Sequence, residues 1–490
     1  MVSGLALSRH EVRFARRMVM TAGVASITLS TFLVEPATAA TVACGTVITA
    51  DTRLTADVGP CPGIGLVVAA DGVTLDLGGH EVRGDTDARS NGDLGPFGRD
   101  QPGILLRRVS GAAVVNGTVR GFDAGVVIMG GGSNTVRRIT AADNVNYRMV
   151  TGRDVLLEDI DPVTGPFCWF GDGISVFNSN GNVLRENVAR HNGPFSGISL
   201  VGFSDGNVVV NNRTVDNNVV NKAPGTDPNP IDVVGNSICG GIGQGQPAPE
   251  PRGRLIQDVG IRVEGPGADD NLVEGNHVRN SGLAGIMVHG VIAAFGPSNG
   301  YNVIRRNHVS GTGAANAGLD RQLHGIMLHH SGAEEMNGPH DTLVEFNTSS
   351  ANLGGGIMLD TRGPGFWGTV IRHNVVNNNG LDGLHVAGSG DPRGPAPLIL
   401  ANEGRRNGTR AGEVNAMFGP SANYAGTDGA DMGGCSRIVW SGNRFGTVND
   451  RCVAAGGVGW VGGPGKSASS VAAGAMGSLG RGNGRPAELG

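Results

Sequence analysis

Residues 173–188 read GISVFNSNGNVLRENV and residues 197–215 read GISLVGFSDGNVVVNNRTV, so one pattern occurs twice in succession. Each stretch begins with Gly-Ile-x-Val or a close variant and continues into a phrase like Asn-x-Val-x-x-Asn-x-Val. The two starting glycines are 24 residues apart. Apolar and polar residues alternate within both phrases, which is the period of a β-strand. The pattern therefore predicts short strands joined by tight turns.

The two phrases recur from about residue 65 to residue 445 of the chain. Copies of the first phrase begin at Gly65, Gly103, Gly125, Gly173, Gly197, Gly260, Gly285, Gly325, Gly356 and Gly383. A repeat of 24 or 25 residues is too short for two helices, and such short strands cannot bury an apolar face alone, so successive coils must stack. We predict an all-β fold, a right-handed parallel β-helix solenoid of about eleven rungs with an N-terminal cap and extended loops on one edge.

An asparagine of the second phrase recurs at the bend between two strands. Its copies are Asn187, Asn212, Asn276, Asn307, Asn347, Asn374 and Asn402. An asparagine side chain can hydrogen-bond its own backbone and the asparagine of the next rung. We interpret these residues as a structural ladder and not as a catalytic set.

Composition predicts the domain boundaries. Residues 1–40 have the features of an export signal, because arginines precede the apolar run 18–34 and small residues follow it. The β-helix domain is expected to span residues 41–453, with an insertion rich in Pro and Gly near residues 221–259. Residues 454–490, rich in Gly, Ala and Ser, are expected to be a flexible tail. We therefore expect a secreted protein, exported by the Sec or the twin-arginine route, with no membrane span after signal removal.

Six cysteines follow the predicted signal: Cys44, Cys61, Cys168, Cys239, Cys435 and Cys452. An even number of cysteines in an exported chain predicts disulfides. The first and last pairs each span 17 residues near an end of the repeat region, so we expect both to be bonded, with a third bond across the insertion. The Cys-x-x-Cys spacing of a zinc site does not occur, and we assign no metal ligand.

Composition also limits the partners. The formal net charge is −5, and four arginines lie in the predicted signal, so a nucleic acid is not an expected partner. The 85 glycines and 4% aromatic residues suit many tight turns better than a large globular core. The sequence leaves the oligomeric state open.

Side chains alternate along a strand, so parity predicts two outward columns on the Gly-Ile-x-Val sheet. The first column holds Ser175, Ser199, Arg262, Met287, Met327, Met358 and His385. The second column holds Phe177, Val201, Glu264, His289, His329, Asp360 and Ala387. Charged residues and histidines therefore gather in the middle to late rungs.

The turn after the first phrase lengthens in the same rungs. The second phrase begins 9 residues after Gly173, but 17 residues after Gly285 and Gly325 and 13 after Gly356. Long loops on a rigid scaffold commonly build a site. We place the candidate site in a groove over these rungs. The candidate catalytic residues are His329, His289 and Asp360, and the candidate substrate-binding residues are Arg262, Glu264, His330, Arg362 and His385.

With these repeats the chain resembles the right-handed parallel β-helix superfamily that includes pectate lyases, alginate epimerases and lyases, and NosD-like periplasmic proteins. The segment DGVTLDLGGH, residues 71–80, is similar to the first rungs of such proteins, where a capping region leads into the helix. The epimerase motif Tyr-Gly-Ile/Phe-Asp-Pro-His-Asp, laid over HGIMLHH at residues 324–330, places the family histidine on His329. The motif's tyrosine, aspartates and proline are missing, so the resemblance supplies no tyrosine proton donor.

The candidate residues favour attack on a uronic-acid polysaccharide by a lyase or C5-epimerase. Removal of the C5 proton needs a base and a cation that stabilises the enolate-like charge. A histidine fits the first role, and Arg262 or a bound calcium ion fits the second. No other cofactor is required. Glycoside hydrolysis needs two carboxylates about 5.5 Å or about 6.5–9.5 Å apart, and Glu264 and Asp360 lie three rungs apart, so hydrolysis is less favoured.

Other interpretations stay open. A non-catalytic glycan-binding or cell-surface rod needs an extended polar face but no base. Outward histidines often have no role beyond hydrogen bonding or solvation. The methionine column, Met287, Met327 and Met358, fits packing beneath the loops, but its alternation with histidines also fits a soft copper site of a NosD-like protein.

Overall fold

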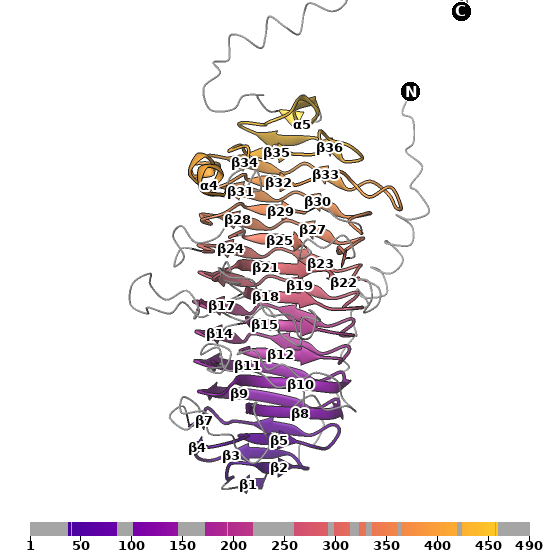
Figure 1. Cartoon of the computed structure of the whole chain (residues 1–490). Coiled ribbons are helices and arrows are strands. Elements are labelled where there is room, and N and C mark those ends of the chain that lie inside the picture. Colours follow the sequence, from indigo (N-terminus) through magenta and orange to yellow (C-terminus); the bar gives the residue numbers. More distant parts are fainter. Residues whose placement is uncertain are drawn as a thin grey trace, which may run out of the picture. The chain divides into compact units, whose positions relative to one another are not determined.

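The computed structural model describes residues 38–40, 42–85, 101–145, 172–193, 195–218, 259–292, 298–313, 323–329, 336–360, 365–418, 424–455 and 457–458. Its strands are joined in parallel along the stacking direction, and each rung contributes strands to three rows. Figure 1 shows these rungs stacked in chain order, from β1 to β36. The predicted parallel β-helix is confirmed.

The ten Gly-Ile-x-Val copies lie in one row of twelve described strands, in which β2 precedes them and β35 follows them; about eleven rungs are expected from the sequence. These strands are β2 (Thr46–Ile48), β5 (Leu66–Val68), β8 (Pro102–Ser110), β10 (Ala124–Gly132), β12 (Ile174–Phe177), β15 (Ser196–Val201), β18 (Val259–Glu264), β21 (Ala284–His289), β25 (Ile326–His329), β29 (Ile357–Leu359), β32 (Leu384–Val386) and β35 (Gly429–Asp431). The glycine that begins each phrase is needed for close approach. A β-carbon on Gly285 would overlap the side chain of Val309 and the carbonyl of Gly325 on the next rung.

The Asn-x-Val phrases form the other two rows, which the longer strands β9 (Ala113–Arg120) and β11 (Thr135–Ala142) join into one sheet. Before them lie β1 (Thr38–Ala40), β3 (Thr52–Leu54), β4 (Val58–Cys61), β6 (Thr74–Asp76) and β7 (Glu81–Gly84). One row continues with β13 (Val183–Arg185), β16 (Val208–Val210), β19 (Leu272–Glu274), β23 (Val303–Arg305), β27 (Leu343–Glu345), β30 (Val370–Arg372), β33 (Leu398–Leu400) and β36 (Val439–Ser441). The other continues with β14 (Val188–Arg190), β17 (Arg213–Val215), β20 (His277–Arg279), β24 (His308–Ser310), β28 (Thr348–Ser350), β31 (Val375–Asn377), β34 (Glu403–Arg405), β37 (Asn443–Phe445) and β38 (Gly457–Val458).

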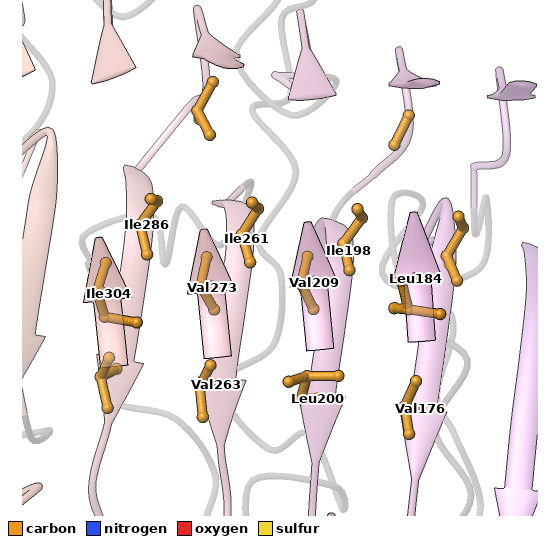
Figure 2. Packing of buried hydrophobic residues seen from close by; sticks show 14 of the residues in the cluster. Val176, Leu184, Ile198, Leu200, Val209, Ile261, Val263, Val273, Ile286 and Ile304 are labelled. Carbon is orange, nitrogen blue, oxygen red and sulfur yellow. The ribbon is translucent and has the colours of Figure 1, made fainter. Parts of the chain in front are cut away.

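The inward apolar residues of the three rows form one continuous core. Figure 2 shows Ile198 and Leu200 of β15 packed in the same layer as Val209 of β16, with equivalent layers on the neighbouring rungs. All three residues are fully buried. The predicted parity of the Gly-Ile-x-Val phrase, in which the first and third residues after the glycine point inward, is therefore confirmed.

The asparagine ladder is also confirmed. The Nδ2 atom of Asn276 donates to Oδ1 of Asn307 at 3.0 Å, and Asn307 donates in turn to Asn347 at 3.0 Å. The residue before each of these asparagines turns the chain through the left-handed region, as at Arg306 with φ 55° and Phe346 with φ 54°. Such a backbone costs about 1–2 kcal/mol per residue, and the amide bonds of the ladder compensate for it.

Loops and ends complete the described structure. The loops after β21 and β25 pair through the antiparallel strands β22 (Val291–Ile292) and β26 (Met336–Asn337), so two of the three predicted long loops share one edge. The disulfides Cys44–Cys61 and Cys435–Cys452 form as predicted. The helices α4 (Ala411–Phe418) and α5 (Arg451–Ala455) lie in the last rungs. No helix in the described ranges has both the length and the apolar character that a membrane span requires.

Several predictions fall largely or wholly outside the described residues. The predicted signal overlaps them only at β1, and the predicted insertion only at Val259. The helix α5 and strand β38 occupy the start of the predicted tail, and the rest of that tail is not described. Cys168, Cys239, His330 and Arg362 also lie outside the described residues.

Candidate functional site

The second outward column brings four of the candidate residues into one line. The strand register places Glu264 beside His289 and His289 beside His329, on the successive strands β18, β21 and β25. Asp360 follows β29 on the next rung and meets His329 from the far side. The four side chains form a row of carboxylate, imidazole, imidazole and carboxylate along the stacking direction. We call this the polar row.

Each imidazole of the polar row has a carboxylate at its Nδ1 atom. His329 Nδ1 lies 2.8 Å from Asp360 Oδ2, and His289 Nδ1 lies 3.5 Å from Glu264 Oε1. The two rings are tilted by 50°, with their centroids 5.6 Å apart. All four side chains are shielded from solvent, and His289 is the most accessible of them at 14% side-chain exposure. A carboxylate at Nδ1 orients an imidazole and stabilises its protonated form, as acid–base chemistry requires.

Arg262 begins the polar row by pairing with Glu264. Its Nη1 atom donates to Glu264 Oε2 at 2.5 Å, and its Nε atom donates to the hydroxyl of Ser196 at 3.2 Å. The guanidinium also lies over the Phe195 ring, 3.9 Å from its centroid. Burial alone would raise the pKa of Glu264, but the charge of Arg262, with that of His289, lowers it to about 2. Glu264 is therefore ionised at neutral pH.

The methionines of the first outward column pack beside the polar row. Met287, Met327 and Met358 form a buried apolar cluster with Val259 and neighbouring residues. This agrees with the interpretation of the column as a packing surface. Across the described ranges, no group of three or more His, Cys, Asp or Glu residues has an arrangement suited to a metal ion.

His385, another candidate residue, lies in a separate buried group. Its Nδ1 atom is 2.8 Å from Asp382 Oδ2, and its ring centroid is 5.1 Å from that of Tyr424. The Tyr424 hydroxyl lies 3.3 Å from Nε2 of His324. The segment 425–427 donates two backbone N–H groups to Asp382, at 3.1 and 2.8 Å. The structure thus pairs His385 with Asp382, a residue outside the predicted set.

Asp172 is a buried acid that the sequence analysis missed. It is 1% exposed, and neither of its carboxyl oxygens has a partner in hydrogen-bonding geometry among the described residues. Burial raises the pKa of Asp172 to about 7, although the charge of Arg262 and the nearby hydroxyls of Ser199 and Ser175 oppose the shift. A carboxyl group with such a pKa exchanges protons near neutral pH.

One sequence signal could have identified the missed residues. Asp172, His324 and Asp382 each stand directly before the glycine of a Gly-Ile-x-Val copy. Strand parity predicts outward positions only after that glycine. The recurring position before the glycine was readable from the sequence, but its outward direction was not, because a period of two places it on the same side as the inward Ile two residues later. Tyr424, which comes from a distant segment, could not be found from the repeat.

A family described as "Right handed beta helix region" matches residues 69–240 and 252–397 of this chain, which is more than half of it. The chain belongs to this family. Its membership agrees with the stacked parallel rows and confirms the predicted right-handed β-helix. No curated protein matches the chain.

Several solved structures are similar to this β-helix protein. The Dettilon tailspike protein matches with a TM-score of 0.43 and 14% identity over 74% of this chain and 56% of its own. The alginate lyase from Paenibacillus sp. str. FPU-7 matches with a TM-score of 0.38 and 12% identity over 74% and 94%. The periplasmic alginate epimerase AlgG matches with a TM-score of 0.35 and 13% identity over 73% and 72%. This chain thus spans little more than half of the tailspike, and the likenesses concern the fold alone.

Proposed function

We propose that this β-helix protein is a secreted carbohydrate-active protein that removes the C5 proton of a uronic-acid polysaccharide, as a lyase or an epimerase does. The observation that supports the proposal is the polar row. It holds two imidazoles on one sheet face, each with a carboxylate at Nδ1. A base held in this way has the orientation and the charge balance that proton abstraction next to a carboxylate requires.

The proposed roles follow from the contacts. His329 acts as the base, and Asp360 orients it and stabilises its protonated form. Arg262 is paired with Glu264, so we assign it to holding Glu264 beside His289 and not to contacting the substrate carboxylate. Arg362 and His330, proposed on sequence grounds, are the candidates for that contact. His385 belongs to a neighbouring group and is assigned to binding the polymer.

The test is an assay of the purified protein on a panel of uronic-acid polymers. We expect unsaturated sugar products, or a changed ratio of uronate epimers, with at least one polymer. His329→Ala should abolish this activity, and His308→Ala is the matched control because His308 is exposed on β24, in a different row. Absence of any product, or full activity of His329→Ala, would contradict the proposal.

The strongest alternative is a non-catalytic glycan-binding rod. The shielding of the polar row favours it, because none of the four side chains exceeds 14% exposure. In that case the protein would be retained on a polysaccharide column without altering the polymer, and His329→Ala would bind as well as the unaltered protein.

A further inference from the structure

The two imidazoles of the polar row lie on one face of the sheet, so they would contact a substrate from the same side. His289 and His329 are register partners on the adjacent parallel strands β21 and β25, so their side chains project from the same sheet face. Adjacent strands lie about 4.8 Å apart, and the ring centroids lie 5.6 Å apart. A sugar ring placed over this pair would meet both imidazoles on one of its two faces.

The carboxylates stand at the two ends of the polar row. Glu264 meets His289 at Nδ1 from the earlier rung, and Asp360 meets His329 at Nδ1 from the later rung. The structure therefore has two acid–imidazole units arranged back to back. His329 and Asp360 form a hydrogen-bonded pair, whereas His289 and Glu264 make a longer contact in which His289 Nδ1 has no hydrogen-bond partner among the described residues. We assign proton transfer to the Nε2 atom of each ring, because Nδ1 is the atom that faces the carboxylate.

We infer that these two units perform a syn elimination, and that the substrates are polymers of uronates whose H5 and O4 lie on the same side of the ring. The inference rests on the proposed function and specifies its stereochemistry. One neutral imidazole removes H5 as a proton. The C4–O4 bond then breaks, its electron pair leaves with O4, and the second imidazole, protonated at the start, gives its proton to O4. A C4=C5 double bond forms, and no oxidant or reductant is needed.

The reaction begins with one imidazole neutral and the other protonated. Epimerisation at C5 would instead need a proton donor on the opposite side of the sugar ring. Among the described residues, both imidazoles of the polar row lie on one side, so the geometry favours elimination.

Sugar stereochemistry then selects the polymer. In mannuronate and glucuronate, H5 and O4 lie on the same side of the ring, so one face of a site can reach both. In guluronate and galacturonate they lie on opposite sides. A pair of groups on one sheet face can assist both halves of the elimination for the first two sugars and only one half for the other two.

The experiment compares four polymers: polymannuronate, β-1,4-linked glucuronan, polyguluronate and polygalacturonate. The readout is ultraviolet absorbance of the unsaturated uronate, with proton NMR in deuterated water to detect C5 exchange or epimerisation. We expect cleavage of polymannuronate or glucuronan at least about tenfold faster than of the other two. His289→Gln and His329→Gln should each slow that cleavage by roughly 10²- to 10⁴-fold, while His308→Gln should not.

The outcomes separate the two proposals. Faster cleavage of polyguluronate or polygalacturonate would overturn the syn assignment and leave uronate chemistry in place. Deuterium entering C5 without unsaturated product would also overturn it, because that result indicates epimerisation. Loss of activity in His329→Gln but not in His289→Gln would rule out the two-imidazole mechanism. No reaction with any of the four polymers would overturn both this inference and the proposed function.

Discussion

His329 and Asp360 come from successive rungs, and the Nδ1 atom of the imidazole lies 2.8 Å from the Oδ2 atom of the carboxylate. The contact fixes the ring orientation, and the negative charge stabilises the imidazolium that forms when His329 accepts a proton. Both side chains are at least nine-tenths buried, so solvent screens this contact little. In the proposed reaction, His329 is the base and Asp360 is the carboxylate that orients it.

Asp360→Asn should lower kcat on a cleaved uronate polymer by at least about tenfold, because an amide cannot balance the imidazolium charge. KM should change less, since Asp360 contacts His329 and is not assigned to the substrate. Steady-state kinetics on the most rapidly cleaved polymer measures both constants, and the circular dichroism melting curve checks the fold. A variant that folds normally and keeps its kcat would exclude Asp360 from proton transfer.

Asp172 should make the stability of the protein depend on pH. Burial raises the pKa of Asp172 from 3.8 to about 7, so the folded protein binds a proton that the unfolded chain releases at lower pH. The stabilisation from this proton is complete below about pH 4 and is lost as pH rises through about 7. A shift of this size corresponds to an upper limit of about 4 kcal/mol.

Asp172→Asn replaces the protonated acid by a neutral group of similar shape. The variant should therefore have nearly the same thermal midpoint as the unaltered protein at pH 4, and a clearly higher midpoint at pH 8. Asp143→Asn is the matched control, because the Asp143 side chain is 48% exposed. An equal effect of Asp172→Asn at both pH values would show that Asp172 does not hold a proton in the folded state.

The sequence predicts the polar row because a strand has a period of two. Once Ile and Val of the first phrase point inward, Glu264, His289 and His329 must point outward at the same register. The same rule could not assign partners within the row, since pairing depends on side-chain rotamers. It therefore could not predict that the guanidinium of Arg262 pairs with Glu264.

The period of the repeat also cannot predict contacts between segments that lie far apart in the sequence. Tyr424 lies 100 residues after His324, beyond α4, and nothing in the repeat indicates that the two side chains meet. The asparagine ladder, in contrast, was predictable because every member has the same place in every rung. Repetition determines the fold and the columns, and irregular segments determine the contacts made by single residues.

Removal of one ladder asparagine should destabilise the whole β-helix. Asn307 accepts hydrogen bonds from the backbone N–H and the side-chain amide of Asn276, and it donates to Asn347 and to the Val273 carbonyl. Asn307→Ala leaves these buried groups unpaired, at a cost of about 1–3 kcal/mol each. The thermal midpoint should fall markedly, whereas His308→Ala, one residue along and exposed, should leave it nearly unchanged. Equal midpoints for the two variants would show that the ladder bonds contribute little to stability.

The buried pair Arg262–Glu264 allows fold and function to be separated. Glu264→Gln removes the carboxylate that pairs with the buried Arg262 guanidinium, so unfolding should become easier by up to about 3–5 kcal/mol. The double variant Arg262→Met, Glu264→Leu removes both charges and keeps apolar volume, so its stability should lie close to that of the unaltered protein. It also removes the carboxylate that faces His289, so elimination should still be slowed. Thermal melting and kinetics on the same preparations measure the two effects. If the double variant melts as early as Glu264→Gln, the instability arises from lost packing around residue 264 and not from the loss of the charge pair.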